Sequence, residues 1–271
     1  MKIEVFDLWN KIPGVCDEKP VITAYIPDKK TSNAAVVIFP GGGYHGRAPH
    51  EGKGYAEFLA QNGISAFVVD YRVAPHEFPI ELLDARRAVK FVRFNAEKLG
   101  IDKNKIAVMG SSAGGHLAAL VSTFTKDALL EVENDEIESE NYLPDAQILC
   151  YPVIETVEPF GHIGSGKNLL GENYPQMVPE VTPDEIAAEG TPQAFIWHTF
   201  EDGAVHIANS LHYAEKLKKI GTPVELHVFP DGRHGIGLCE GDVVADCDKK
   251  MLKHNSQWSK LLLNWLKYIG F

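Results

Sequence analysis

The residues with the clearest chemical potential form the stretch Gly110-Ser111-Ser112-Ala113-Gly114, which matches the pattern G-x-S-x-G. A short apolar run precedes it, and good helix formers with apolar residues at helical spacing follow it. A serine at a sharp turn between a strand and a helix needs small neighbours, because the backbone bends steeply there. Ser112 is therefore the candidate nucleophile, although a Gly/Ser-rich turn without chemistry has the same composition.

A serine nucleophile needs a base, because its hydroxyl is weakly nucleophilic at neutral pH. His234 is the candidate base, since it lies in a glycine-rich loop directly after the last predicted strand. His198 and His206 are its competitors. His198 ends a predicted strand and is expected to make a structural hydrogen bond, whereas His206 begins the next predicted helix.

The base in turn needs a carboxylate that orients it and stabilises its charged form. Asp202 is the candidate, because it lies where the chain turns from the strand ending near His198 into a helix. The alternative is that Asp202 is an ordinary helix N-cap. Glu201 is expected to point elsewhere, and Asp231 is too near His234 in sequence to be its obvious partner.

The third requirement is a set of backbone donors for the oxyanion. Three glycines, Gly41 to Gly43, follow an early predicted strand and let the backbone approach a ligand closely. The amides of Gly42, Gly43 and Ala113 would complete the site, and the positive end of the helix after Ser112 favours negative charge there. A phosphate cradle is the rival interpretation, but no G-K-[ST] follows the glycines and the chain is acidic.

Strands and helices alternate along the chain, which predicts a mostly parallel sheet with helices on both faces. The first two strands lack an intervening helix, so the sheet should start antiparallel. Strands are expected at residues 3–9, 21–26, 34–39, 64–69, 105–109, 146–151, 193–197 and 224–229, and helices at 52–61, 80–99, 114–124, 207–220 and 249–266. We expect residues 1–271 to form a single α/β domain, since a chain of this length commonly does.

Two segments interrupt this alternation. Residues 127–145 are dense in Asp and Glu and are expected to form a solvated surface excursion, with metal capture as a weaker alternative. Residues 155–191 are rich in Gly, Pro and Glu. A loop that long is expected to be a cover or binding loop over the carboxyl ends of the strands, where ligands bind in open α/β sheets.

Net charge and composition limit the classes of partner that the chain is expected to bind. The formal net charge of −11 opposes binding to nucleic acid, and no Lys/Arg-rich run offsets it. No signal-peptide core or membrane-spanning stretch is visible, so a soluble, cytoplasmic protein without a membrane partner is expected. The four cysteines lack C-x-x-C spacing and are expected to be reduced, with Cys150 buried in an apolar run.

Several motifs in order along the chain carry a resemblance to a known family. They are Pro40-Gly41-Gly42-Gly43-Tyr44, Asp70 to Pro75, Gly110 to Gly115, Trp197-His198-Thr199 with Asp202, and Gly232-Arg233-His234-Gly235. With these motifs the chain resembles α/β-hydrolase carboxylesterases, particularly the bacterial carbohydrate acetyl or feruloyl esterases that are often called xylan-esterase-like. It is also similar to hormone-sensitive-lipase-like esterases, but Pro40 stands where those place a histidine and His206 where a proline is usual.

The resemblance implies an α/β-hydrolase fold with Ser112 as nucleophile, Asp202 as acid, His234 as base and oxyanion amides from Gly42, Gly43 and Ala113. It implies hydrolysis of short-chain esters, above all acetyl esters of sugars or oligosaccharides, with no metal or cofactor. Tyr44 is expected at the site mouth in contact with substrate, with a packing role as the alternative. An amidase or arylformamidase on the same fold and a catalytically silent binding protein are the alternative functions, and a homodimer stays open.

Overall fold

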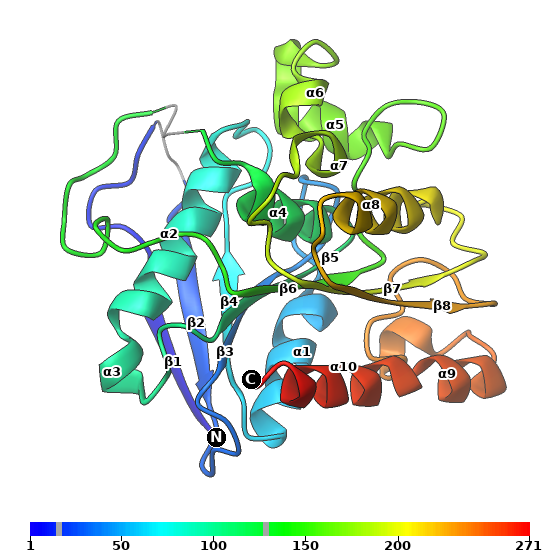
Figure 1. Ribbon diagram of the computed structural model, residues 1–271, viewed down its shortest axis with the longest axis horizontal. Coiled ribbons are helices and arrows are strands. Elements are labelled where there is room, and N and C mark those ends of the chain that lie inside the picture. The colour runs from blue at the N-terminus through cyan, green and yellow to red at the C-terminus, as the bar shows by residue number, and fades with distance from the viewer. Residues whose placement is uncertain (15–17, 127–129) are drawn as a thin grey trace.

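The eight strands form one sheet in the order β1-β2-β4-β3-β5-β6-β7-β8 (Figure 1). The structure, a computed structural model, describes residues 1–14, 18–126 and 130–271. β1 pairs with β2, and β2 with β4, in antiparallel register, whereas all later pairs are parallel. The predicted antiparallel start is therefore confirmed. The strands are β1 (Lys2–Asp7), β2 (Val21–Ile26), β3 (Ala35–Phe39), β4 (Ser65–Asp70), β5 (Ile106–Ser111), β6 (Ala146–Cys150), β7 (Ala194–Thr199) and β8 (Val224–Phe229).

Helices cover both faces of the sheet, so the central strands are buried throughout. Every residue of β3, β5, β6 and β7 is buried, which explains why their sequences are almost continuously apolar. One face packs against α1 (Pro49–Gln61) and α10 (Gln257–Tyr268), and the other against α2 (Ile80–Phe94), α4 (Ser112–Thr123) and α8 (Ala208–Lys219). Two apolar cores result, one on each side of the sheet.

The predicted helices occur with three adjustments. The predicted helix at 80–99 is divided between α2 and the short α3 (Ala96–Leu99), and the one at 249–266 between α9 (Lys249–Asn255) and α10. α1 begins earlier than predicted, at Pro49, because proline suits the first turn of a helix. Within the described residues, no helix is long and apolar enough to cross a membrane.

Residues 155–191, here called the cover segment, are largely helical and not an irregular loop. They contain α5 (Ile163–Leu170), the 3-10 helix η1 (Gly171–Asn173), α6 (Val178–Val181) and α7 (Pro183–Ile186). These helices gather above α4, and α7 lies between α4 and α8 (Figure 1). Val178, Val181 and Leu169 are buried in the same core as α4, so the segment is anchored by apolar contacts.

Residues 130–145, here called the acidic loop, form a surface excursion beside α2, as the sequence suggested, but several of their acids are paired with α2 instead of being only solvated (Figure 1). Arg87 of α2 is only 1 % exposed and pairs with Asp135 and Glu138. Lys90 also pairs with Glu138, and Arg93 pairs with Asp145. The acids therefore neutralise cations of α2, and the described residues contain no cluster of metal-ligating side chains.

The cysteines whose placement is described are free thiols. Cys150 is buried in β6, as expected, and burial raises the pKa of its thiol to about 12. Cys239 is also buried, and Cys247 is half-buried. Cys16, like Asp127 of the predicted acidic excursion, lies outside the described residues.

Candidate active site

Ser112 lies at the tight turn where β5 meets α4, with a left-handed φ of 53°. A Cβ atom on Gly114 would lie 2.0 Å from the Phe39 carbonyl oxygen, and one on Gly110 would lie 2.0 Å from the Gly114 carbonyl oxygen. Only glycine fits at these positions, because the turn presses β5, α4 and the end of β3 together. The strained turn holds Ser112 in a fixed orientation at the carboxyl end of the sheet.

Three predicted residues form one hydrogen-bonded chain at this edge of the sheet. Ser112 Oγ lies 2.8 Å from His234 Nε2, and His234 Nδ1 lies 2.7 Å from Asp202 Oδ2. The three side chains follow β5, β7 and β8, so distant parts of the sequence meet where parallel strands end. The geometry suits proton transfer from a serine hydroxyl to an imidazole that a carboxylate orients.

Asp202 pairs with His234 and also holds the turn after β7, but it is not the helix N-cap offered as the alternative, because the N-cap of α8 is Ile207. Its Oδ1 accepts the backbone N–H groups of Ala204 and Val205, both at 2.9 Å, and its Oδ2 accepts from His234. Burial tends to raise the pKa of Asp202, but hydrogen bonds from His198 and His234, the charge of His234 and the Val205 amide outweigh burial. The pKa of Asp202 is therefore well below its ordinary value, and the group is a carboxylate at neutral pH.

The competing histidines do not reach Ser112. His198 is buried and makes the structural contacts expected of it, at 2.7 Å to Ser210 Oγ and 3.0 Å to the Val205 carbonyl. It also lies 3.3 Å from Asp202 Oδ2 and so helps to hold the acid. His206 is exposed and its ring stacks on Phe160 of the cover segment, with ring centroids 4.8 Å apart.

The three amides expected to form an oxyanion hole are free to bind a ligand. In the part of the chain that the structure describes, the N–H groups of Gly42, Gly43 and Ala113 have no hydrogen-bond acceptor. Gly42 has a φ of 141°, and a Cβ atom there would lie 2.2 Å from the Gly46 carbonyl oxygen, so the loop requires glycine. The Ala113 amide belongs to the first turn of α4, where N–H groups lack partners inside the helix.

Tyr44 does not lie at the site mouth, which corrects the expectation that its side chain contacts substrate. The side chain is completely buried, and its hydroxyl lies 2.8 Å from Nδ1 of His116 in α4. Its left-handed φ of 58°, directly after the glycine loop, directs the ring into the core. The alternative packing role fits this position.

A buried carboxylate that the sequence analysis did not identify, Glu51, forms a hydrogen bond with the glycine loop. Glu51 of α1 is 3 % exposed; its Oε2 accepts the Gly41 N–H at 2.9 Å, and its Oε1 accepts the Tyr151 hydroxyl at 2.8 Å. The Tyr151 ring packs edge-on against His234 at 5.1 Å between centroids. Glu51 thus links the oxyanion loop to the ring beside the base, but an acid in the first turn of a helix is too common to have indicated this role.

The cover segment also brings polar groups to the site. Asn168 Nδ2 donates to the Gly43 carbonyl at 2.8 Å, and Ser165 Oγ is 4.0 Å from where a Cβ atom on Gly43 would lie. His162, at the start of α5, interacts electrostatically with His234 and Asp202. The sequence indicated a cover here, but it did not identify the individual residues that face the site.

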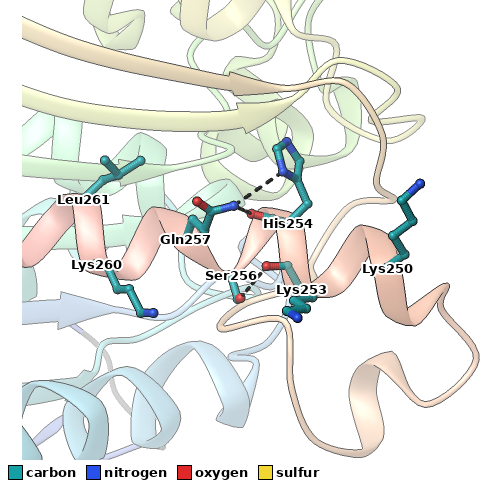
Figure 2. Close-up of a pocket in the computed structure, with 7 residues that line it drawn as sticks. All are labelled: Lys250, Lys253, His254, Ser256, Gln257, Lys260 and Leu261. Atoms are coloured by element: carbon teal, nitrogen blue, oxygen red, sulfur yellow. Dashed lines mark hydrogen bonds between the residues drawn. The ribbon is translucent and has the colours of Figure 1, made fainter.

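A separate groove of about 560 Å³ lies along α9 and α10. Figure 2 shows Lys250, Lys253 and Lys260 along it, with His254 pointing toward the sheet edge. No ion pair engages these three lysines in residues 1–14, 18–126 and 130–271. None of the lining residues forms a hydrogen bond with Ser112 or His234, so the groove is not part of the site described above.

Comparisons with known proteins agree with this geometry. The family model BD-FAE matches residues 22–217. Similar proteins include endo-1,4-beta-xylanase B of Butyrivibrio fibrisolvens, 34 % identical over 82 % of this chain and 35 % of its own length. Another is an acetylxylan esterase of Xylanibacter ruminicola, 31 % identical over 93 % of this chain and 49 % of its own length. The chain thus spans between a third and a half of the length of these curated relatives.

A solved structure is similar over nearly its whole length. The acetyl ester-xyloside bifunctional hydrolase from Caldicellulosiruptor lactoaceticus has a TM-score of 0.88 and 42 % sequence identity, with 99 % of this chain and 97 % of that one covered. The shared architecture extends from the antiparallel start of the sheet to α10.

Proposed function

The chain belongs to the BD-FAE family of α/β-hydrolase esterases, and from this premise we propose that it is a serine esterase that removes acetyl groups from sugars or oligosaccharides. The observation that carries the proposal is the hydrogen-bonded chain from Ser112 through His234 to Asp202 beside three free amides. A hydroxyl, a base, an orienting carboxylate and oxyanion donors are together sufficient for acyl transfer.

In the acylation step, Ser112 Oγ attacks the ester carbonyl carbon while its proton moves to His234 Nε2. The carbonyl oxygen becomes an oxyanion that the amides of Gly42, Gly43 and Ala113 stabilise, assisted by the positive end of α4. His234 then gives the proton to the departing alcohol oxygen as the ester C–O bond breaks. Asp202 stays ionised throughout and stabilises the imidazolium.

In the deacylation step, a water molecule attacks the acyl-enzyme carbonyl and His234 takes a proton from that water. The second tetrahedral intermediate collapses, the bond from the acyl carbon to Ser112 Oγ breaks, and His234 returns the proton to Ser112. The carboxylic acid is released, and the enzyme returns to its starting state.

The preference for acetyl esters of sugars rests on the relatives. One of these relatives is named an acetylxylan esterase and another an acetyl ester-xyloside bifunctional hydrolase. We also propose that residues 1–271 act as one domain with the cover segment as part of the substrate pocket. The homodimer and the cytoplasmic location stay predictions.

The test is the variant Ser112→Ala, measured on an acetylated xylo-oligosaccharide, 4-nitrophenyl acetate and an N-formyl aromatic amine. Loss of the nucleophile should lower kcat by at least about 10³-fold on every ester that the wild type hydrolyses. The wild type should be labelled by a fluorophosphonate at Ser112, and the variant should stay unlabelled. Near-normal ester hydrolysis by the variant would refute the mechanism, and preferential turnover of the formamide would refute the substrate class.

A further inference from the structure

His162 is held in one tautomer by its position as the N-cap of α5. The Ser165 backbone N–H lies 3.1 Å from His162 Nδ1, and Ser165 Oγ lies 2.8 Å from the same nitrogen. A backbone N–H can only donate, so Nδ1 must be the unprotonated acceptor. The proton of the neutral ring is therefore on Nε2, and Nε2 is a hydrogen-bond donor with no protein acceptor among the described residues.

The surroundings of His162 favour the neutral ring, because they lower its pKa. Burial lowers the pKa of His162, and the charge of His234 lowers it further, against smaller opposing effects from Asp202 and the backbone. The side chain is nevertheless half-exposed. It is therefore a neutral donor that is not sealed in the core.

A buried asparagine clamps the backbone on one side of this ring. Asn209 of α8 is completely buried; its Oδ1 accepts the N–H groups of Ile154 and Glu155 at 2.8 and 2.9 Å. Its Nδ2 donates to the Phe160 carbonyl at 2.9 Å. The Phe160 ring then stacks on the ring of His206, which directly follows the loop that holds Asp202. His162, two residues later, is thereby tied to the loop that holds Asp202.

The segment that carries His162 is also held on its other side, because Asn168 Nδ2 donates a hydrogen bond to the Gly43 carbonyl in the glycine loop. His162 therefore lies on a segment fixed at both ends to catalytic loops. His234 must protonate the departing alcohol, so the alcohol half of the ester lies on the His234 side of Ser112. Ser165 Oγ, which lies 2.8 Å from His162 Nδ1, is 4.0 Å from where a Cβ atom on Gly43 would lie. The His162 ring therefore lies near the loop that supplies the oxyanion amides, and the stack of Phe160 on His206 ties its segment to the loop of Asp202, the partner of His234.

We propose that His162 is a specificity-determining residue whose Nε2–H donates a hydrogen bond to a hydroxyl oxygen on the alcohol half of the ester. The inference rests on the proposed esterase function and specifies what the site recognises. Sugar acetates carry a hydroxyl on the carbon adjacent to the one that bears the ester oxygen, whereas aryl and simple alkyl acetates do not. A fixed donor beside the leaving oxygen selects for that hydroxyl, because a substrate without it leaves the donor unpaired.

Two substitutions separate substrate recognition from helix capping. His162→Asn keeps an acceptor for the Ser165 N–H, since asparagine is among the best N-caps, but it removes the distal donor. His162→Gln weakens the cap but carries an amide N–H near the position of Nε2. Both are compared on a monoacetylated methyl xyloside and on its deoxy analogue, which lacks the neighbouring hydroxyl. His254→Phe, in the groove of Figure 2, is the control histidine variant.

We expect His162→Asn to lower kcat/KM about 10-fold on the xyloside acetate and to leave the deoxy analogue and 4-nitrophenyl acetate within about twofold. His162→Gln should retain more activity on the xyloside than His162→Asn. The opposite order, or equal losses on the two xylosides, would show a purely structural role and overturn the inference. A wild type inactive on 4-nitrophenyl acetate as well would instead overturn the proposed esterase function.

Discussion

Two long excursions leave the sheet on either side of β6, and different forces hold them. The acidic loop precedes β6 and is held by ion pairs to Arg87, Lys90 and Arg93 of α2. The cover segment follows β6 and is held mainly by the neutral amide of Asn209, by aromatic stacking and by apolar helices, with one pair between Glu155 and His212 at its start. Glu180 of the cover segment also forms an exposed ion pair with Lys126, which lies just after α4 and outside the acidic loop.

The difference follows from what each excursion contacts. The acidic loop covers a cationic helix face away from Ser112, so charge neutralisation suffices there. The cover segment contributes His162 and Asn168 beside a base that becomes positively charged during the reaction. Extra charges near that base would disturb its proton transfers, whereas amides and neutral rings fix geometry without adding a field. The ion-paired excursion should therefore affect stability alone, and the neutral one should affect both stability and activity.

The largest effect on stability should come from Arg87→Met. The guanidinium is almost fully buried, and besides its carboxylate partners it donates from Nε to the Leu8 carbonyl at 3.0 Å. Its removal leaves several acids and a backbone carbonyl without their partner, which should cost about 3 kcal/mol. Urea unfolding measures the loss, and kcat/KM of the folded variant on an acetyl ester should stay within about twofold.

Lys126→Met is the matched control, because it removes a cation from an exposed ion pair. It should change the free energy of unfolding by less than about 1 kcal/mol. Equal losses for the two variants would contradict the importance of burial at Arg87, and a large fall in kcat/KM for Arg87→Met would contradict the division of roles between the excursions.

Asn209→Ala should combine a smaller loss of stability with a loss of activity. The buried N–H of Ile154 and the Phe160 carbonyl lose their partners, which should cost about 2 kcal/mol. The cover segment then loosens beside the base, and kcat/KM on a sugar acetate should fall about 10-fold at a temperature where the variant is folded. The loss should be nearly independent of salt concentration, since no ion pair is removed.

Asn209→Asp tests the hydrogen-bond pattern, because it keeps the acceptor for Ile154 and Glu155 and removes the donor to Phe160. It should fall between the wild type and Asn209→Ala in activity. Full activity in both variants would mean that the cover segment does not depend on this clamp.

The comparison also explains which parts of the molecule the sequence could predict. The strand-turn-helix around Ser112 is encoded locally, since Gly110 and Gly114 are the residues that its sterics require. The burial of strands β3 and β5 to β7 could be predicted from their apolar runs. Asp202 and His234 could be proposed because each follows a predicted strand, and parallel strands bring their carboxyl ends together.

Other features depend on contacts between distant segments. Asn209 and Glu51 are ordinary polar residues of amphipathic helices, and only the folded chain shows that they are buried. The ion pairs of the acidic loop were not predicted, because the partners Arg87, Lys90 and Arg93 lie in another segment, although their spacing on one face of α2 was a usable signal. The position of the Tyr44 side chain was predicted wrongly, because its direction depends on a left-handed backbone conformation at Tyr44. The preceding glycines permit this conformation but do not specify it.

The smallest predicted effect concerns His116, a buried titratable ring of α4 near the cover segment. The ring is completely buried, pairs with the Tyr44 hydroxyl and interacts with the backbone of Val181 in α6. Burial lowers its pKa to about 4, below the value near 6.5 expected in the unfolded chain. Between these values the unfolded state binds more protons than the folded state, so stability falls as the pH falls.

This ring alone should remove about 1 kcal/mol of stability between pH 7 and pH 5.5. Asp202 does not contribute in this window, because its lowered pKa costs stability only below about pH 4. His116→Gln keeps a polar side chain and cannot titrate, so its free energy of unfolding should be lower at pH 7 but should vary less with pH than that of the wild type. Unfolding by urea at several pH values gives both slopes, and buried acids common to the two proteins, such as Glu81, cancel in the difference. If the free energy of unfolding depended on pH equally in the two proteins, protonation of His116 would not contribute to the loss of stability.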